Sequence, residues 1–231
     1  YGQRDEFLYN KGNGDQNNSV LIDNMLYLNQ FDHPLPVEQQ MLYKYAEARL
    51  ALESSRSYEM LANFKDFQKH CTENNIKTLG GPMLGNVSTN SVNVWTRTIK
   101  PASVEVLVSA EGKEKRFGPL ESGYESQLSV VIPLTGLEPG VKYAYKVFVD
   151  GEKIETPFET SFHTISDKNE DNTRILFGSC FHRWGLGNEK QSKSMLAREA
   201  DAFLAIGDIA VQDKLNHVGW HSLDYLARDL Y

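Results

Sequence analysis

The sequence predicts a multidomain chain with a helical N-terminal segment, an antiparallel β-sandwich, and then the first βαβ part of an α/β domain. Before residue 79, apolar side chains recur every three or four positions, and beyond it they alternate with period two. Two short apolar runs near the end of the chain flank a helix-forming segment. The predicted parts are 1–78, 79–165, a polar linker at 166–172, and 173–231.

The N-terminal part reads as an irregular, polar lead-in over residues 1–18 followed by two amphipathic helices joined around 54–55. An apolar stripe that packs on a neighbouring domain explains this pattern better than a cofactor site. The residues of the two stripes are Met41, Leu42, Tyr45, Ala48 and Leu52, then Tyr58, Leu61, Phe64 and Phe67.

The next part alternates polar and apolar residues over Ser91–Thr98, Ser103–Ser109 and Lys142–Val149, which predicts short strands of a β-sandwich. The segment Leu137–Tyr143 resembles the tyrosine corner of fibronectin type III domains, in which a phenolic hydroxyl bonds a nearby backbone group. We therefore expect a fibronectin III-like sandwich with Trp95 in its core.

A sandwich of this kind could also serve as an adhesion or carbohydrate-binding module. That function needs exposed aromatic side chains, for which Tyr124, Tyr143 and Tyr145 are the candidates. Most such tyrosines are packed inside the domain, which favours a structural role for them.

Two apolar runs near the end of the chain are each followed by side chains that can bind metals. The run 174–178 leads into Cys180 and His182, and the run 202–206 leads into Gly207 and Asp208. The connection between the runs includes a helix-forming segment, Lys193–Ala200, and is long enough for a crossover between parallel strands. We expect two buried parallel strands whose carboxyl ends meet at one edge.

A thiolate, an imidazole and a carboxylate at one point can hold a metal ion that lowers the pKa of a bound water. Each residue also has a plain explanation. Cys180 could be a small buried hydrophobic residue and Asp208 could cap a helix, although an aspartate after an apolar run gains most from a cation. Cys180, Asp208 and His182 are the predicted metal ligands. His217, His221 and Arg183 are weaker candidates that could lie near the site, Arg183 as a phosphate contact.

The segments 177–182, 201–208 and 224–231 together resemble the alkaline phosphatase D-like branch of the calcineurin-like metallophosphatase superfamily. The resemblance implies a metal-dependent phosphomonoesterase or phosphodiesterase that uses a metal-activated hydroxide. It also implies that Asp208 bridges two metals and that Cys180 binds the more thiophilic one, with iron and calcium as the expected pair.

The branch usually carries a tyrosine three residues after its bridging aspartate, where this chain has Val211, so zinc and manganese remain open alternatives. The superfamily's Gly-Asn-His-Asp-like segment is not found before Tyr231. We therefore expect the remainder of the catalytic domain in cis or as a second chain. The resemblance further implies a phosphoester small-molecule substrate and an exported protein.

Composition narrows the classes of function. The formal net charge is −7, and the sequence has no cluster of Lys and Arg to offset it, which argues against a general nucleic-acid binder. No run approaches the roughly 20 apolar residues of a membrane span. Cys71 and Cys180 fall in different predicted domains, so we expect Cys71 to be a free thiol.

Two other enzyme classes fail on sequence. A papain-like Cys180 would need a histidine far downstream, and Ser179 lacks the Gly-x-Ser-x-Gly elbow of a serine nucleophile. The remaining alternative is a catalytically silent structural or binding segment, because one βαβ unit cannot bury both faces of a parallel sheet.

Overall fold

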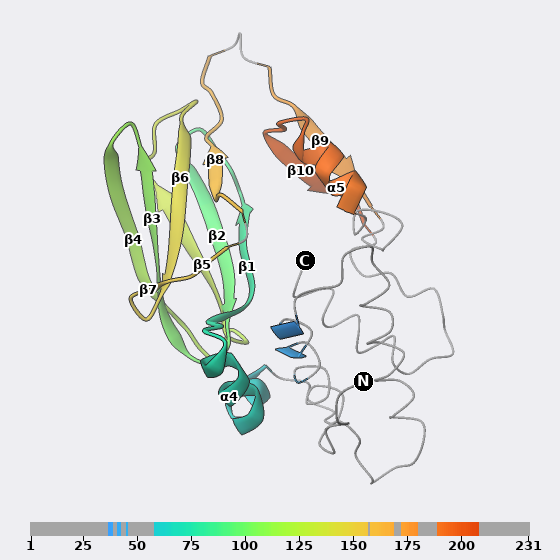
Figure 1. Cartoon of the computed structure of the whole chain (residues 1–231). Coiled ribbons are helices and arrows are strands. Elements are labelled where there is room, and N and C mark those ends of the chain that lie inside the picture. Colours follow the sequence, from blue (N-terminus) through green and yellow to red (C-terminus); the bar gives the residue numbers. More distant parts are fainter. Residues whose placement is uncertain are drawn as a thin grey trace. The chain divides into compact units, whose positions relative to one another are not determined.

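The computed structural model describes most of the middle of the chain (Figure 1). The residues described are 37–38, 41–42, 45, 58–156, 158–168, 172–179 and 189–207. Their elements, in order, are α3 (Glu59–Ala62), α4 (Lys65–Glu73), β1 (Thr78–Gly85), β2 (Ser91–Thr98), β3 (Ala102–Ala110), β4 (Lys113–Ser122), β5 (Ser129–Thr135), β6 (Lys142–Val149), β7 (Glu152–Lys153), β8 (Ser161–His163), β9 (Ile175–Gly178), α5 (Glu189–Leu196) and β10 (Ala202–Ala205).

Strands β1 to β8 form an antiparallel β-sandwich, as the sequence predicts. One sheet has the order β1-β2-β5, and the other has the order β4-β3-β6-β7 with β8 paired to β6. The central pairings, β2 with β5 and β3 with β6, are both antiparallel. Figure 1 shows the two sheets as separate layers that face each other.

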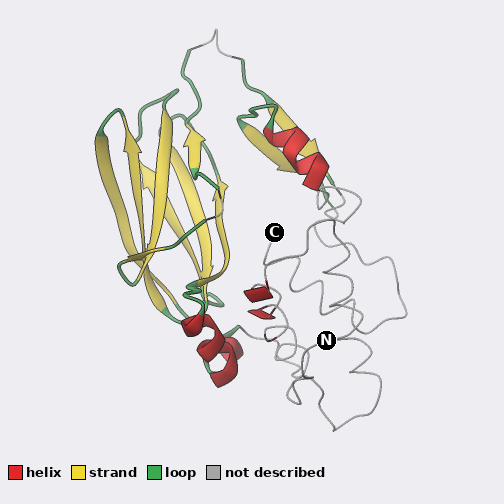
Figure 2. Cartoon of the chain, in the orientation of Figure 1, coloured by secondary structure: helices red, strands yellow, loops and turns green. Residues whose placement is uncertain are grey.

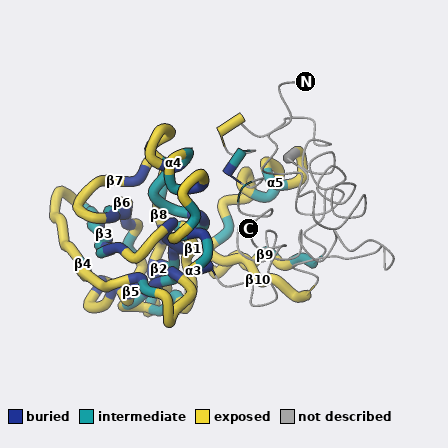
Figure 3. Tube along the Cα trace, turned by 90° about the horizontal axis from the view of Figure 1, so that it is seen from below, coloured by how far each residue is buried: buried dark blue, intermediate teal, exposed yellow. Residues whose placement is uncertain are grey.

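The core lies between the two sheets and follows the period of the strands. In β2, Val92 and Val94 point inward, while in β3 the inward positions are Val104, Val106 and Val108. All five side chains are at most 2% exposed, and Figure 3 colours the buried positions of the sandwich dark blue. The predicted bounds of β2 and β6 agree with the structure, because β6 buries every second residue and β2 does so as far as Thr96.

Trp95 lies outside this core, so the prediction that it is a core residue is wrong. The inward positions of β2 are the even-numbered ones, which places Trp95 on the outer face, between Met83 of β1 and Val131 of β5. The guanidinium of Arg97 lies 5.5 Å from the centre of its ring. The alternation of β2 was predicted correctly, but the large aromatic ring of Trp95 lies on the outward-facing side of the strand.

The predicted tyrosine corner is present. The hydroxyl of Tyr143 accepts a hydrogen bond of 2.9 Å from the backbone N–H of Glu138. The Tyr143 ring is buried and stacks on Phe162, with ring centres 5.4 Å apart. This corner ties the connection before β6 to the strand itself, which is the arrangement expected of a fibronectin III-like sandwich.

The N-terminal part contains helices in the residues that the structure describes (Figure 2). Residues 37–38, 41–42 and 45 are helical, and the segment predicted as the second helix is divided into α3 and α4. The division falls at Phe64, whose backbone is extended, with φ of −89° and ψ of 108°. Tyr58, Leu61 and Phe67 of the predicted apolar stripe are buried, while Phe64 is half-buried.

The sequence has no apolar run long enough to predict a membrane span. Among the helices that the structure describes, none is both long enough and apolar enough to span a bilayer.

Candidate functional site

Strands β9 and β10 pair with each other and are connected through α5. The amide of Asp201 donates to the carbonyl of Arg174 at 2.9 Å, and the amide of Ile206 donates to the carbonyl of Gly178 at 2.9 Å. Partner numbers rise together along both strands, so the pair is parallel. In addition, a side-chain oxygen of Asp201 accepts a 2.7 Å bond from the Arg174 amide.

The carboxyl ends of β9 and β10 therefore lie at the same edge. Gly207 follows this edge with a φ of +124°, a conformation that residues with a Cβ rarely adopt, so a glycine permits the change in chain direction. The candidate site residues themselves lie outside the described residues: Cys180, His182, Arg183, Asp208, Val211, His217 and His221. Their roles stay predictions.

The expectation that both strands are buried is wrong for the described structure. Every residue of β10 is exposed, and the Phe177 side chain of β9 is 71% exposed. Figure 3 shows β10 largely in the colour of exposed residues. The apolar runs identified the strands correctly, but burial also needs elements that cover both faces of the sheet, and α5 leaves its own Leu196 78% exposed.

The crossover helix begins and ends four residues before the predicted segment. It covers Glu189–Leu196 and ends in a turn at 197–198, followed by Glu199, whose φ of +47° is in the left-handed region. That left-handed residue cannot continue a right-handed helix. The prediction of a helix between the strands is correct, whereas its bounds are wrong.

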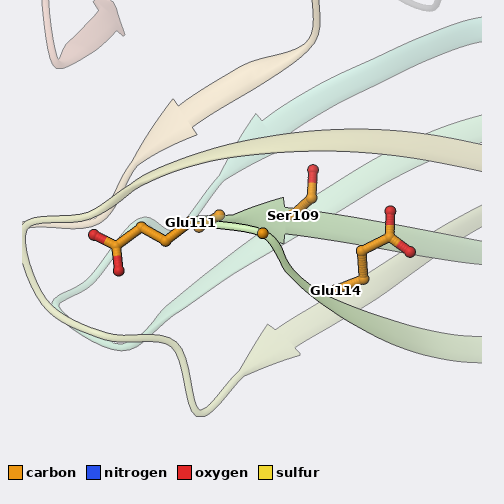
Figure 4. Close-up of a pocket in the computed structure, with 5 residues that line it drawn as sticks. Ser109, Glu111 and Glu114 are labelled. Atoms are coloured by element: carbon orange, nitrogen blue, oxygen red, sulfur yellow. The ribbon is translucent and has the colours of Figure 1, made fainter.

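Other parts of the described chain offer no competing metal site. Within those residues, no group of three or more His, Cys, Asp or Glu side chains is placed to hold a metal. A shallow hollow at the β3–β4 turn is lined by Ser109, Ala110, Glu111, Gly112 and Glu114. Figure 4 shows the side chains of Glu111 and Glu114 extending away from each other, so the two carboxylates do not converge.

Cys71 is a free, fully buried thiol. Burial raises its pKa to about 12, so the reactive thiolate is suppressed at neutral pH. A nucleophilic or redox role for Cys71 is therefore disfavoured by its surroundings.

The aromatic residues considered for a binding function are mostly packed. Tyr143 and Tyr145 are both buried, and burial raises the pKa of Tyr145 to about 12. Tyr124 is 40% exposed. Because two of the three candidates are inside the sandwich, they cannot form an aromatic binding surface.

A family model matches the sandwich. The model is described as a domain of unknown function (DUF7800), and it covers residues 76–166, which is less than half of the chain. No curated protein matches the sequence.

Several solved structures are similar to part of the chain. A structure of PhoD is 19% identical with a TM-score of 0.37, over 45% of this chain and 22% of that one. A fibronectin type III domain from the human KIAA0970 protein is 18% identical with a TM-score of 0.32, over 48% of this chain and 89% of that one. A sensor domain of the anti-sigma factor RsgI4 from Pseudobacteroides cellulosolvens is 12% identical with a TM-score of 0.29, over 36% of this chain and 88% of that one.

The chain thus matches about a fifth of the length of the PhoD structure. At these identities and scores, the three likenesses do not carry an argument about function. An activity has to be inferred from the residues of this chain.

Proposed function

We propose that this chain belongs to a metal-dependent phosphoester hydrolase of the alkaline phosphatase D-like type, with its metal site at the carboxyl ends of β9 and β10. The observation that supports it best is the parallel pairing, with the Ile206 amide bonded to the Gly178 carbonyl at the edge where both strands end. Cys180 comes two residues after β9, and Asp208 three residues after β10.

In the proposed site, Asp208 would be shared by two metals, and Cys180 and His182 would contribute a thiolate and an imidazole. This donor set suits iron or zinc at the sulfur side and calcium or manganese at the oxygen side. When bound, the metals supply Lewis acidity and a water of lowered pKa.

The residues of this chain would have three tasks in such a site. Asp208 would fix the spacing between the ions, the thiolate of Cys180 would donate electron density to one of them, and Gly207 would let the chain change direction before Asp208. Arg183 and His217 are proposed to contact the phosphoryl group or its leaving oxygen at the mouth of the site.

The domain organisation is part of the same proposal: 1–78 precedes the sandwich at 79–165, and after a linker at 166–172 the catalytic part begins at 173. The exposed Phe177 and Leu196 side chains support a further covering layer, which we propose is the remainder of the catalytic domain, in cis or as a second chain. The resemblance also motivates the proposal of an exported protein, which cell fractionation would test.

Metal analysis together with hydrolysis of a chromogenic phosphomonoester and phosphodiester tests this function. The purified chain should hold a transition metal that is lost in Cys180→Ser and Asp208→Asn, whereas Asp167→Asn, which changes an exposed carboxylate in the linker, should keep it. Hydrolysis that persists in metal-free protein would refute the proposal.

The second candidate is a catalytically silent segment, which the exposure of β9, α5 and β10 favours for the chain alone. Metal bound with the predicted sensitivity to Cys180 and Asp208, but without hydrolysis until a second polypeptide is added, would mean that the site needs that polypeptide. Protein that neither binds metal nor hydrolyses either ester would favour the silent segment.

A further inference from the structure

Asp201 makes a double contact at the start of the β9–β10 pair. Its carboxylate accepts the Arg174 amide at 2.7 Å, while its own amide donates to the Arg174 carbonyl at 2.9 Å. Arg174 directly precedes β9 and Asp201 directly precedes β10. Asp201 thus bonds both the amide and the carbonyl of Arg174 at the amino end of the strand pair.

The strand pair itself defines its register weakly. Each strand has four residues, and all four positions of β10 are exposed, so burial of one face does not select among alternative pairings. At the opposite end, the bond from the Ile206 amide to the Gly178 carbonyl joins backbone groups, which every register can offer. An anchor that depends on a side chain adds the specificity that the short ladder lacks.

We infer that Asp201 is a positioning residue whose side chain and main chain together hold β9 and β10 in one register. The bond to the ionised carboxylate is charge-assisted and therefore stronger than a bond between neutral groups. Because positions 200 and 202 are alanines, a slip of one residue would leave the Arg174 amide without a carboxylate to bond.

The register also sets where the residues beyond the two strand ends lie. A slip of one residue displaces one strand end by about 3.3 Å relative to the other. Metal–sulfur and metal–oxygen bonds are about 2.0–2.3 Å long, so such a slip exceeds a whole coordination bond. This second step rests on the proposed function: by fixing the register, Asp201 sets the distance between Cys180 and Asp208.

Hydrogen exchange of single amides in the full chain tests the anchor. In Asp201→Ala, exchange should quicken at the Arg174 amide, and also at the Ile206 amide at the far end of the pair. We expect about fivefold or more at both, the factor that corresponds to a hydrogen bond of ordinary net strength. Asp201→Asn should fall between the alanine variant and the parent, because its amide oxygen still accepts the bond.

Glu199→Gln is the matched control, since it changes an exposed carboxylate in the same connection. The Val106 amide in the sandwich core reports whether the sandwich remains folded in the variants. A change confined to Arg174 would show a local contact and overturn the inference, as would unchanged exchange at both amides.

Zinc titration separates this inference from the proposed function. If the parent chain binds zinc, Asp201→Ala should weaken the binding by about tenfold, as for residues that orient metal ligands. Unchanged zinc affinity alongside faster exchange at Ile206 would overturn the link to the site. A parent chain that binds no zinc would count against the proposed function, and the exchange data would still decide the role of Asp201.

Discussion

Removing the hydroxyl of Tyr143 tests whether the tyrosine corner stabilises the sandwich. Tyr143→Phe removes the acceptor that lies 2.9 Å from the backbone N–H of Glu138, in a hydrogen bond that is partly buried. The phenyl ring can keep its stacking on Phe162, so the change isolates the hydrogen bond. Leaving such a donor unsatisfied costs about 1–3 kcal/mol of the free energy of unfolding.

Hydrogen exchange of the slowest sandwich amides measures this loss without requiring the whole chain to unfold in one step. At about 1.4 kcal/mol per tenfold change, exchange should quicken by about 5-fold to 150-fold. Tyr124→Phe makes the same chemical change at a side chain that is 40% exposed, and it should alter stability by less than about 0.5 kcal/mol. Equal effects of the two variants would refute the reasoning.

Three further predictions concern burial. Trp95→Ala should cost less than the about 3–5 kcal/mol of a core aromatic residue, because the ring is only half-buried on the outer face, where it contacts the buried Arg97. In β5, Leu134→Ala should cost about 2–5 kcal/mol, since Leu134 is fully buried, whereas Val131→Ala on the outer face should have a small effect. Cys71 should resist a thiol reagent at about pH 8 in the folded chain and react once the chain unfolds. Because burial raises its pKa from 9.0 to about 12, its contribution to stability is complete below pH 9 and is lost as the pH rises towards 12.

Urea unfolding of the variants and a thiol titration check these predictions. A loss of several kcal/mol in Trp95→Ala would show that the ring belongs to the core. Equal losses in Leu134→Ala and Val131→Ala would contradict the assignment of the two faces of β5. Rapid modification of Cys71 in the folded chain would contradict its burial.

The strands that the sequence predicted best are those with one buried and one exposed face. In β2 and β6 the alternation matches the pleat, so both ends of each strand could be placed. Strand β4 was missed because half of its residues are charged and most are exposed, as suits an edge strand that must not pair further. Alternation of residue types separates the two faces of a strand but does not tell which face is inside. Trp95 was assigned to the inner face of β2 for that reason, although it lies on the outer face.

Only the framework of the predicted site could be foreseen. The apolar runs predicted β9 and β10, and the length of the connection predicted the helix between them, so the parallel pair was expected. Burial of these strands was not predictable, because it depends on elements that cover them and not on their own sequence. Cys180, His182 and Asp208 lie outside the described residues, and their convergence stays a prediction. The contact of Asp201 with Arg174 was missed, since no periodic pattern marks a single capping carboxylate.

X-ray absorption of the zinc-loaded chain tests the central claim most directly, because it reports the atoms bound to the metal. The proposed site predicts a zinc–sulfur distance of about 2.3 Å that disappears in Cys180→Ser but persists in Cys71→Ser. A metal shell of nitrogen and oxygen alone in the parent chain, or a sulfur signal that survives the loss of Cys180, would contradict it.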